Sequence, residues 1–222
     1  MNENTPFGGD KKVGASILAK PEKAFINWAI PKIPSWTNSR MLTLMTLVWS
    51  AGIILTGYLA SVESFGVLWI ISVCIFLQWL TDSLDGSLGR HRNEGWVKWG
   101  YYMDHFLDYI FLCSILIAYS LILPDNFKYL LFFLLVVLGA FMVNSFLAFA
   151  ATNTFRIVYL GIGPTEIRIV FIIINTLLAF FGKTYMAPAL PWILGASIIG
   201  LMVVIYRTQK EIATLDIQTK NS

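Results

Sequence analysis

Hydrophobic residues in this chain gather into long stretches that are separated by shorter polar segments. A helix needs about 20 predominantly apolar residues to cross the hydrocarbon core of a bilayer. Six stretches meet or approach that length: Met41–Ala60, Ser64–Thr81, about Gly100–Leu123, Tyr129–Thr152, about Ile167–Phe181 and Tyr185–Tyr206. The pattern therefore predicts an all-α, polytopic membrane protein with six transmembrane helices.

A different pattern precedes the first stretch. Between Pro21 and Ile30, apolar and polar residues recur at helical spacing. Pro21 suits the first turn of a helix and Pro31 ends it. Trp28 and Trp36 suit the membrane–water interface. We expect a short amphipathic helix that lies on the membrane surface, with an unstructured basic leader as the alternative.

Lysine and arginine residues are distributed unevenly around these stretches. With six spans both termini share one side of the membrane, and 14 of the 16 Lys and Arg residues fall on that side. Only Lys128 and Lys183 fall on the other. Cationic loops are retained in the cytoplasm. We therefore expect a cytoplasmic N-terminal segment with a surface helix (1–40), a six-helix transmembrane domain (41–206) and a cytoplasmic tail (207–222).

Composition supports the membrane assignment. The 222 residues are 57% hydrophobic and 13% charged, about half the charged fraction of roughly 25% in soluble domains. This balance argues against a soluble enzyme, a disordered chain and a nucleic-acid-binding protein. Cys74 and Cys113 both lie in apolar stretches, so no disulfide framework is implied.

Four aspartates stand where membrane helices are expected to end or begin. Asp82 and Asp85 follow the second stretch and are three residues apart; Asp104 and Asp108 lie near the start of the third and are four apart. Each spacing places both carboxylates on one helix face. Because the two helices are antiparallel neighbours, we expect the pairs to face each other at similar depth. Charged groups at such positions are costly and usually functional.

Bare carboxylates in one small space would repel one another, so either some are protonated or cations neutralise them. Hard oxygen ligands suit Mg²⁺, Mn²⁺ or Ca²⁺. Gly86 and Gly100 permit the close approach of a ligand or a backbone, and Arg90 is placed to bind a phosphate. The sequence predicts a two-metal site for a phosphorylated substrate, with one carboxylate taking a proton from an attacking hydroxyl.

These residues form a longer motif. The run Asp82-Ser-Leu-Asp85-Gly86-Ser-Leu-Gly89-Arg90, followed by Gly100-Tyr-Tyr-Met-Asp104-His-Phe-Leu-Asp108, resembles the signature of the CDP-alcohol phosphotransferases, D-x2-D-G-x2-A-R and then G-x3-D-x3-D. The six helices and the surface helix also resemble that family's topology. Gly89 stands where the family usually has Ala, and nine residues rather than seven or eight separate Arg90 from Gly100.

The resemblance implies that a CDP-linked alcohol donates a substituted phosphate to an acceptor hydroxyl, with release of CMP, in phospholipid synthesis. It assigns the metal ligands, Asp82, Asp85, Asp104 and Asp108, to two Mg²⁺ or Mn²⁺ ions. It makes Asp108 the general base as well. Homodimers are typical of the family.

The CDP-binding surface implied by the resemblance comprises Gly86, Arg90 and Gly100, with Asp82 and Asp85. Family members often carry an Asn and a Thr near the nucleotide at the start of the first helix. Asn38 and Thr43 stand there, but their five-residue separation is wider than usual. Neither is therefore assigned a role.

Five further residues are candidates for substrate binding: Gln78, His105, Arg156, Glu166 and Arg168. Each has a plainer alternative. Glu166 fits a helix cap, Arg156 fits the charge rule for cytoplasmic loops, and Gln78 fits interhelical hydrogen bonding. His105 fits a role beside the site rather than in it, and Glu166 and Arg168 would face the same chamber as the aspartates.

Several functional alternatives stay open. CDP-diacylglycerol is the favoured donor, and CDP-choline or CDP-ethanolamine with diacylglycerol as acceptor is the alternative. A divalent-cation transporter would use the aspartates as an ion path, but it needs polar groups across the membrane midplane. The expected partners are the CDP-linked alcohol, a lipid or polar acceptor and membrane lipids. The expected location is the inner or plasma membrane of a bacterium, with the site facing the cytoplasm.

Overall fold

The structure is a computed structural model, and it describes residues 16–62, 65–155, 158, 161–182 and 186–220. These residues form an all-α fold, as predicted, and no strand occurs among them. Two short 3₁₀ helices, η1 (Ile30–Lys32) and η2 (Phe65–Val67), accompany seven α-helices: α1 (Ala19–Ala29), α2 (Ser39–Val62), α3 (Leu68–His91), α4 (Val97–Ile122), α5 (Asp125–Thr152), α6 (Pro164–Phe181) and α7 (Met186–Lys220).

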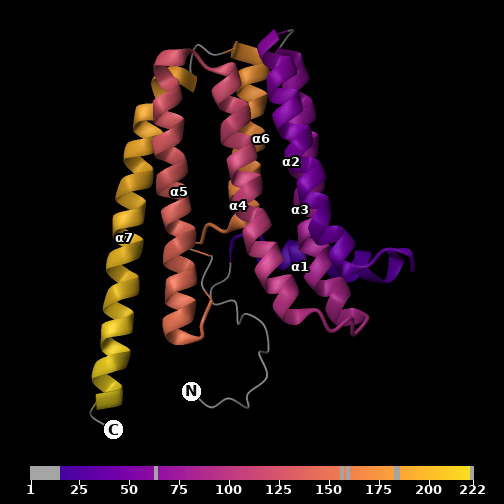
Figure 1. The fold of residues 1–222 in the computed structure, drawn as a ribbon, viewed down its shortest axis with the longest axis vertical. Helices are drawn as coiled ribbons and strands as arrows, with labels where there is room; N and C mark the ends of the chain where they lie inside the picture. Colours follow the sequence, from indigo (N-terminus) through magenta and orange to yellow (C-terminus); the bar gives the residue numbers. More distant parts are fainter. Residues whose placement is uncertain (1–15, 63–64, 156–157, 159–160, 183–185, 221–222) are drawn as a thin grey trace.

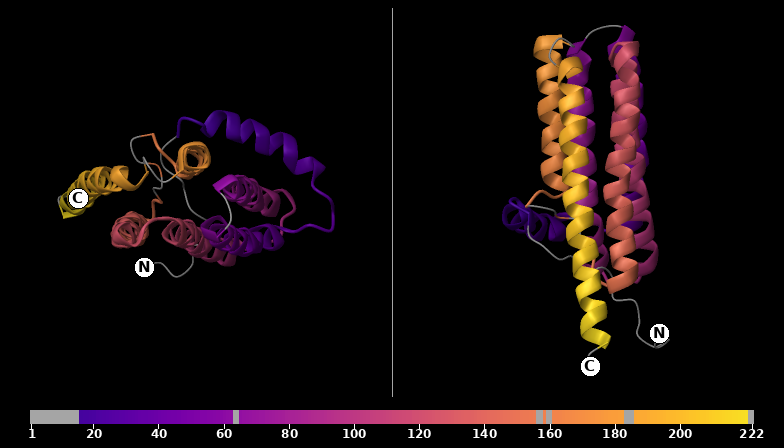
Figure 2. Two further views of the ribbon diagram at one scale, coloured as in Figure 1. Left: turned by 90° about the horizontal axis from the view of Figure 1, so that it is seen from above. Right: turned by 90° about the vertical axis from the view of Figure 1, so that its left-hand side faces the viewer.

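Helices α2 to α7 are each long and apolar enough to cross a membrane, so the six predicted spans are confirmed. They run side by side along the long axis of the molecule (Figure 1). Helix α2 packs against α3 and α4, and α6 packs on the other side of α3. Helix α5 packs on α4 and carries α7 at the edge of the bundle (Figure 2).

The main core lies where α2, α3 and α4 meet. Ile53, Ile71, Ile75 and Ile115 are fully buried there. Gly57 of α2 lies directly against Ala118 of α4: a Cβ atom on Gly57 would come within 2.6 Å of the Ala118 Cβ. A glycine at this point allows the two backbones to approach closely, as small residues do in membrane helix pairs.

Two asparagines, Asn144 and Asn175, join helices through their side-chain amides. The Tyr119 hydroxyl of α4 donates to Asn175 Oδ1 of α6 at 2.9 Å, and Asn175 Nδ2 donates to Ser72 Oγ of α3 at 3.2 Å. Asn144 Nδ2 of α5 donates to Thr208 Oγ1 of α7 at 3.3 Å. These hydrogen bonds tie together helices whose remaining contacts are apolar.

Helix α3 continues well past the end of its apolar stretch. The second apolar stretch stops at Thr81, but α3 ends at His91 and α4 begins at Val97. The helix is longer than the apolar stretch because hydropathy marks lipid contact and not helix length. Leu84 and Leu88 bury the extra turns against Ile30, which belongs to the segment after α1.

The predicted surface helix is present as α1. It lies across the axis of the bundle rather than along it, towards the end where α3 meets α4 (Figures 1 and 2). None of its residues is fully buried, and Trp28 is exposed. At the same end of the molecule α7 continues without a break to Lys220, so residues 207–220 of the expected tail are helical.

Candidate active site

The two aspartate pairs lie on neighbouring helices, Asp82 and Asp85 on α3 and Asp104 and Asp108 on α4. Asp85 is buried, whereas the side chains of Asp82, Asp104 and Asp108 retain between 19% and 27% of their exposure. Three of the four carboxylates are thus partly accessible. Asp85 lies within electrostatic reach of both Asp82 and Asp108. The pairs therefore share one acidic region, as the spacing predicted.

Arg168 of α6 connects the two aspartate helices. One nitrogen of its guanidinium group, Nη2, donates to Asp82 Oδ2 at 2.9 Å and to Asp108 Oδ1 at 3.0 Å. Arg168 is only 5% exposed, so the arginine end of both ion pairs is buried, and charge-assisted hydrogen bonds of this kind are strong. The sequence placed Arg168 near the aspartates, and the structure brings it into contact with them.

Gln78 completes the arginine's surroundings. Its Oε1 atom accepts a hydrogen bond from Arg168 Nε at 2.7 Å, and the residue is fully buried one turn before Asp82. Gln78 Nε2 is buried and has no hydrogen-bond partner among the described residues. Such a group normally finds a partner. Gln78 thus makes an interhelical hydrogen bond, the plainer of its two expected roles, and its Nε2 donor is unused among the described residues, while a part in substrate binding stays a prediction.

Asp85 is held by a residue that sequence reasoning passed over. Thr43 Oγ1 of α2 donates to Asp85 Oδ2 at 2.5 Å, and the backbone N–H of Gly86 donates to Asp85 Oδ1. Thr43 is itself buried. The family's frequent Thr near the nucleotide was the available signal, and the wider spacing from Asn38 led to its dismissal. Asn38 instead caps α2, accepting a hydrogen bond from the Met41 N–H.

His105 lies inside an aromatic cluster rather than in the open site. Its Nδ1 atom is 3.8 Å from Asp104 Oδ2. Its ring packs edge-on against Tyr101 at 4.6 Å and tilted against Phe155 at 4.5 Å, with Phe146 also in contact. These rings belong to α4, α5 and the segment after α5. The packing fixes His105 beside Asp104, as the predicted supporting role requires.

The residues implied in CDP binding lie on the same two helices as the aspartates: Gly86 and Arg90 follow Asp85 on α3, and Gly100 is one turn before Asp104 on α4. Nothing lies within 4 Å of the position that a Cβ on Gly100 would occupy. Arg90 is exposed, and its Nη2 atom donates to Ser87 Oγ at 3.2 Å. A Cβ on Gly86 would meet only the end of the Arg90 side chain. Both glycines therefore leave room beside the aspartates.

Glu166 serves as a cap and a tie. Its Oε2 atom accepts a hydrogen bond from the N–H of Gly163, the N-cap of α6, and its Oε1 atom accepts one from the N–H of Leu18. The capping interpretation of Glu166 is confirmed. Arg156, the remaining candidate for substrate binding, lies outside the described residues.

A second acidic residue, Glu22 of α1, fastens that helix to α3 and α6. Glu22 accepts hydrogen bonds from Ser83 Oγ of α3 at 3.1 Å and from Thr165 Oγ1 of α6 at 2.9 Å. Ser83 lies directly after Asp82, and Thr165 is one turn before Arg168. The surface helix is thereby attached to the segments that carry the site.

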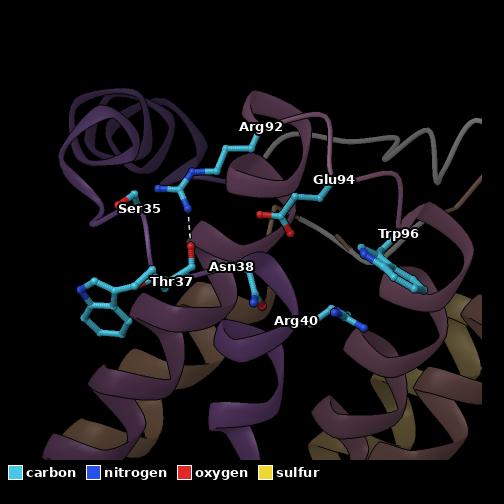
Figure 3. Close-up of a pocket in the computed structure, with 8 residues that line it drawn as sticks. Ser35, Thr37, Asn38, Arg40, Arg92, Glu94 and Trp96 are labelled. Carbon is cyan, nitrogen blue, oxygen red and sulfur yellow. Dashed lines mark hydrogen bonds between the residues drawn. The ribbon is translucent and has the colours of Figure 1, made fainter.

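A separate cleft of about 310 Å³ opens at the start of α2 (Figure 3). In its lining, Glu94 accepts a hydrogen bond from the Ser39 hydroxyl at 2.6 Å. The guanidinium carbon of Arg40 lies 4.3 Å from the centre of the Trp96 ring. Arg92 donates to the carbonyl oxygen of Thr37. The described residues that line the cleft are Ser35, Trp36, Thr37, Asn38, Arg40, Arg92, Glu94 and Trp96. None of the four aspartates is among them.

The donor chemistry of the acidic region fits divalent cations. Its ligands are carboxylate oxygens, which Mg²⁺ and Mn²⁺ prefer, and three of them are accessible. Within the part of the chain that the structure describes, no three His, Cys, Asp or Glu side chains converge closely enough to hold an ion. Arg168 provides the positive charge between Asp82 and Asp108 instead.

Comparison with known proteins agrees with this geometry. No curated protein matches the chain. Residues 36–206 match the family described as CDP-alcohol phosphatidyltransferase. The matched region begins before α2 and ends within α7, so it contains all four aspartates and Arg168. The chain therefore belongs to the CDP-alcohol phosphatidyltransferase family, whose members are transferases that use a CDP-linked alcohol.

Proposed function

We propose that this protein transfers a phosphatidyl group from CDP-diacylglycerol to the hydroxyl of a second alcohol and releases CMP, in the synthesis of membrane phospholipid. The observation that carries the proposal is the arrangement of Asp82 and Asp108 around one buried arginine, inside the region that matches the family. Such a cluster of charge on membrane helices is hard to explain by structure alone.

The four aspartates are the proposed metal ligands. Asp82, Asp85, Asp104 and Asp108 would hold two Mg²⁺ or Mn²⁺ ions, which when bound neutralise the diphosphate of the donor. Thr43 orients the Asp85 carboxylate toward the site through its 2.5 Å hydrogen bond. Gly86 and Gly100 give the CDP group room, and Arg90 binds its phosphates from the open side.

Asp108 is the proposed general base. It is one of the accessible carboxylates of the cluster, so an acceptor hydroxyl is able to reach it. Asp108 accepts the hydroxyl proton as the oxygen attacks the phosphorus, and the bond from phosphorus to CMP breaks. Arg168, which contacts Asp108, is placed to stabilise negative charge at the same position.

The proposed orientation places the site at the cytoplasmic side. The cations that flank α1, the α3–α4 connection and the end of α7 would then all face the cytoplasm, as the positive-inside rule requires. A water-soluble product such as CMP would be released directly into that compartment.

The test is CMP release by purified protein in liposomes with Mn²⁺ or Mg²⁺. CDP-diacylglycerol is supplied with glycerol phosphate, serine or inositol, and CDP-choline and CDP-ethanolamine are supplied with diacylglycerol. We expect metal-dependent CMP release with CDP-diacylglycerol. Release only with CDP-choline or CDP-ethanolamine would replace the proposed donor, and no release from any pair by folded protein would refute the function.

Asp108→Asn is the decisive variant, because a general base contributes about 10²- to 10⁴-fold to the rate. The matched control is Asp125→Asn. Asp125 is an exposed carboxylate at the start of α5 and pairs with Lys128 in the same helix. The first variant should lose nearly all activity and the second should retain it.

A further inference from the structure

The contact between Arg168 and the aspartates has an unusual form. A single nitrogen, Nη2, lies 2.9 Å from Asp82 Oδ2 and 3.0 Å from Asp108 Oδ1. An arginine paired with one carboxylate commonly uses two parallel N–H groups instead. Here one positive centre joins carboxylates from α3 and α4, which is the role that a bridging cation plays in an acidic site.

Arg168 faces further negative groups besides the two carboxylates that it contacts. Asp104 and Glu22 also lie within electrostatic reach of its guanidinium group. The residue is buried beside Gln78, and its guanidinium carbon is 5.6 Å from the Phe111 ring centre. Carboxylates that crowd together away from water require such compensation, because their mutual repulsion is poorly screened there.

Arg168 and divalent cations therefore compete for the same two carboxylates. Asp82 and Asp108 are proposed metal ligands, and Nη2 already contacts one oxygen of each, Asp82 Oδ2 and Asp108 Oδ1. The Arg168 side chain has an independent anchor in Gln78, whose Nε2 donor is unused among the described residues. That anchor would keep the arginine within the site if its bonds to the aspartates broke.

We propose that Arg168 is an exchangeable counter-cation, which holds Asp82 and Asp108 in the metal-free protein and gives them up when divalent cations bind. The inference rests on the proposed function in one respect, the binding of metal by these aspartates. Once released, the guanidinium group stays beside the site and is available to the substrate phosphates.

A permanent ion pair and an exchangeable one predict opposite changes in metal affinity when Arg168 is removed. If Arg168 only braces the site, its removal disorganises Asp82 and Asp108 and weakens metal binding. If it competes with metal, its removal leaves the carboxylates more negative and strengthens metal binding. The sign of the change in metal affinity therefore separates the two roles.

The experiment measures Mn²⁺ binding to the chelator-treated protein by electron paramagnetic resonance, without substrate. Wild type is compared with Arg168→Gln and with the control Arg207→Gln, an exposed arginine on α7. We expect Arg168→Gln to bind Mn²⁺ about tenfold more tightly, since one nearby positive charge is lost. The metal-free variant should also melt at a lower temperature than wild type and regain stability with Mn²⁺. Arg207→Gln should match wild type in both measurements.

Arg168→Lys covers the case in which the glutamine variant does not fold. A lysine holds two carboxylates less well than arginine does, so Mn²⁺ should again bind more tightly than to wild type. Unchanged or weaker binding in the folded variants overturns the exchange. If the wild type still releases CMP with metal, the proposed function survives that result. A wild type that neither binds Mn²⁺ nor releases CMP overturns both.

Discussion

At the scale of single residues, Thr43 shows how a neutral group organises a charged one. Its hydroxyl donates to a buried carboxylate oxygen of Asp85, while the Gly86 N–H donates to the other. Both oxygens of Asp85 therefore have fixed partners. The consequence is a carboxylate that is oriented before any ligand arrives.

Thr43→Val removes this hydrogen bond and preserves the shape of the side chain. A hydrogen bond to a charged group is worth about 1.5–3 kcal/mol, so we expect the kcat/KM of CMP release to fall by about tenfold or more. More metal should also be needed for half-maximal rate. The control is Thr56→Val on the same helix. The Thr56 hydroxyl donates to the carbonyl oxygen of Gly52, one turn earlier in α2. Equal activities in the two variants would exclude the assigned role of Thr43.

A substitution at Gly100 tests whether the substrate occupies the open space beside this residue. A methyl group added there meets nothing within 4 Å, and the residue lies in α4. Alanine favours a helix over glycine by about 1 kcal/mol. Gly100→Ala should therefore fold at least as stably as wild type in thermal unfolding, yet show a raised KM for the CDP-alcohol. An unchanged KM would indicate that the substrate does not approach Gly100.

The sequence predicted the site's acids better than their partners. Aspartate spacing within one helix fixes a shared face, so the four carboxylates were found without a structure. The bonds from Thr43 to Asp85 and from Arg168 to Asp82 join residues 42 and 86 positions apart. Such pairs depend on how helices pack, and no periodicity within one helix reveals them.

At the scale of elements, α2 and α4 owe their close approach to a missing side chain. A Cβ at Gly57 would lie 2.6 Å from the Cβ and 2.7 Å from the Cα of Ala118. A backbone atom cannot move aside as the end of a flexible side chain does. The two helices would have to separate, and with them the α2 and α4 residues that line the site.

Gly57→Ala should consequently destabilise the protein by about 1–3 kcal/mol, the usual cost of overpacking, despite the better helix propensity of alanine. Gly195→Ala on α7 is the matched control, because nothing lies within 4 Å of its added methyl group. Denaturant unfolding in detergent compares the two. If both variants are as stable as wild type, the close α2–α4 contact is not needed.

Helix lengths were the least predictable feature of the elements. Hydropathy located every span but stopped α3 near Thr81, ten residues before its observed end at His91. The added turns are held by Leu84 and Leu88 packed on Ile30. Polar residues surround Leu84 and Leu88 in the sequence, so hydropathy did not reveal this contact, because an amphipathic helix end has no long apolar run.

At the scale of the whole molecule, the proposed orientation rests on the six spans and the charge bias. Arg92 in the α3–α4 connection and Lys98 in the first turn of α4 lie at one end of the bundle, whereas Lys128 pairs with Asp125 in the first turn of α5. The span count was predictable because each crossing needs a long apolar stretch. The relative positions of the helices were not, because lipid-facing and core-facing residues are similarly apolar.

Cysteine labelling checks the orientation in intact cells. In a background without Cys74 and Cys113, Lys98→Cys should react with a membrane-impermeant maleimide only after permeabilisation. Asn126→Cys should react before it. Both positions are exposed, Lys98 in the first turn of α4 and Asn126 in the first turn of α5, and each is the control for the other. The reverse pattern would place the site outside the cytoplasm.

The length of α7 sets where attached groups can sit. Its 35 residues correspond to about 50 Å at 1.5 Å per residue, and a bilayer core is about 30 Å thick. Helix α7 is therefore about 20 Å longer than the hydrocarbon core is thick. A fluorescent protein joined after α7 would stand clear of the lipid headgroups, whereas one joined just before α1 would crowd the helix that Glu22 ties to the site. The end of α7 is the better place for a probe.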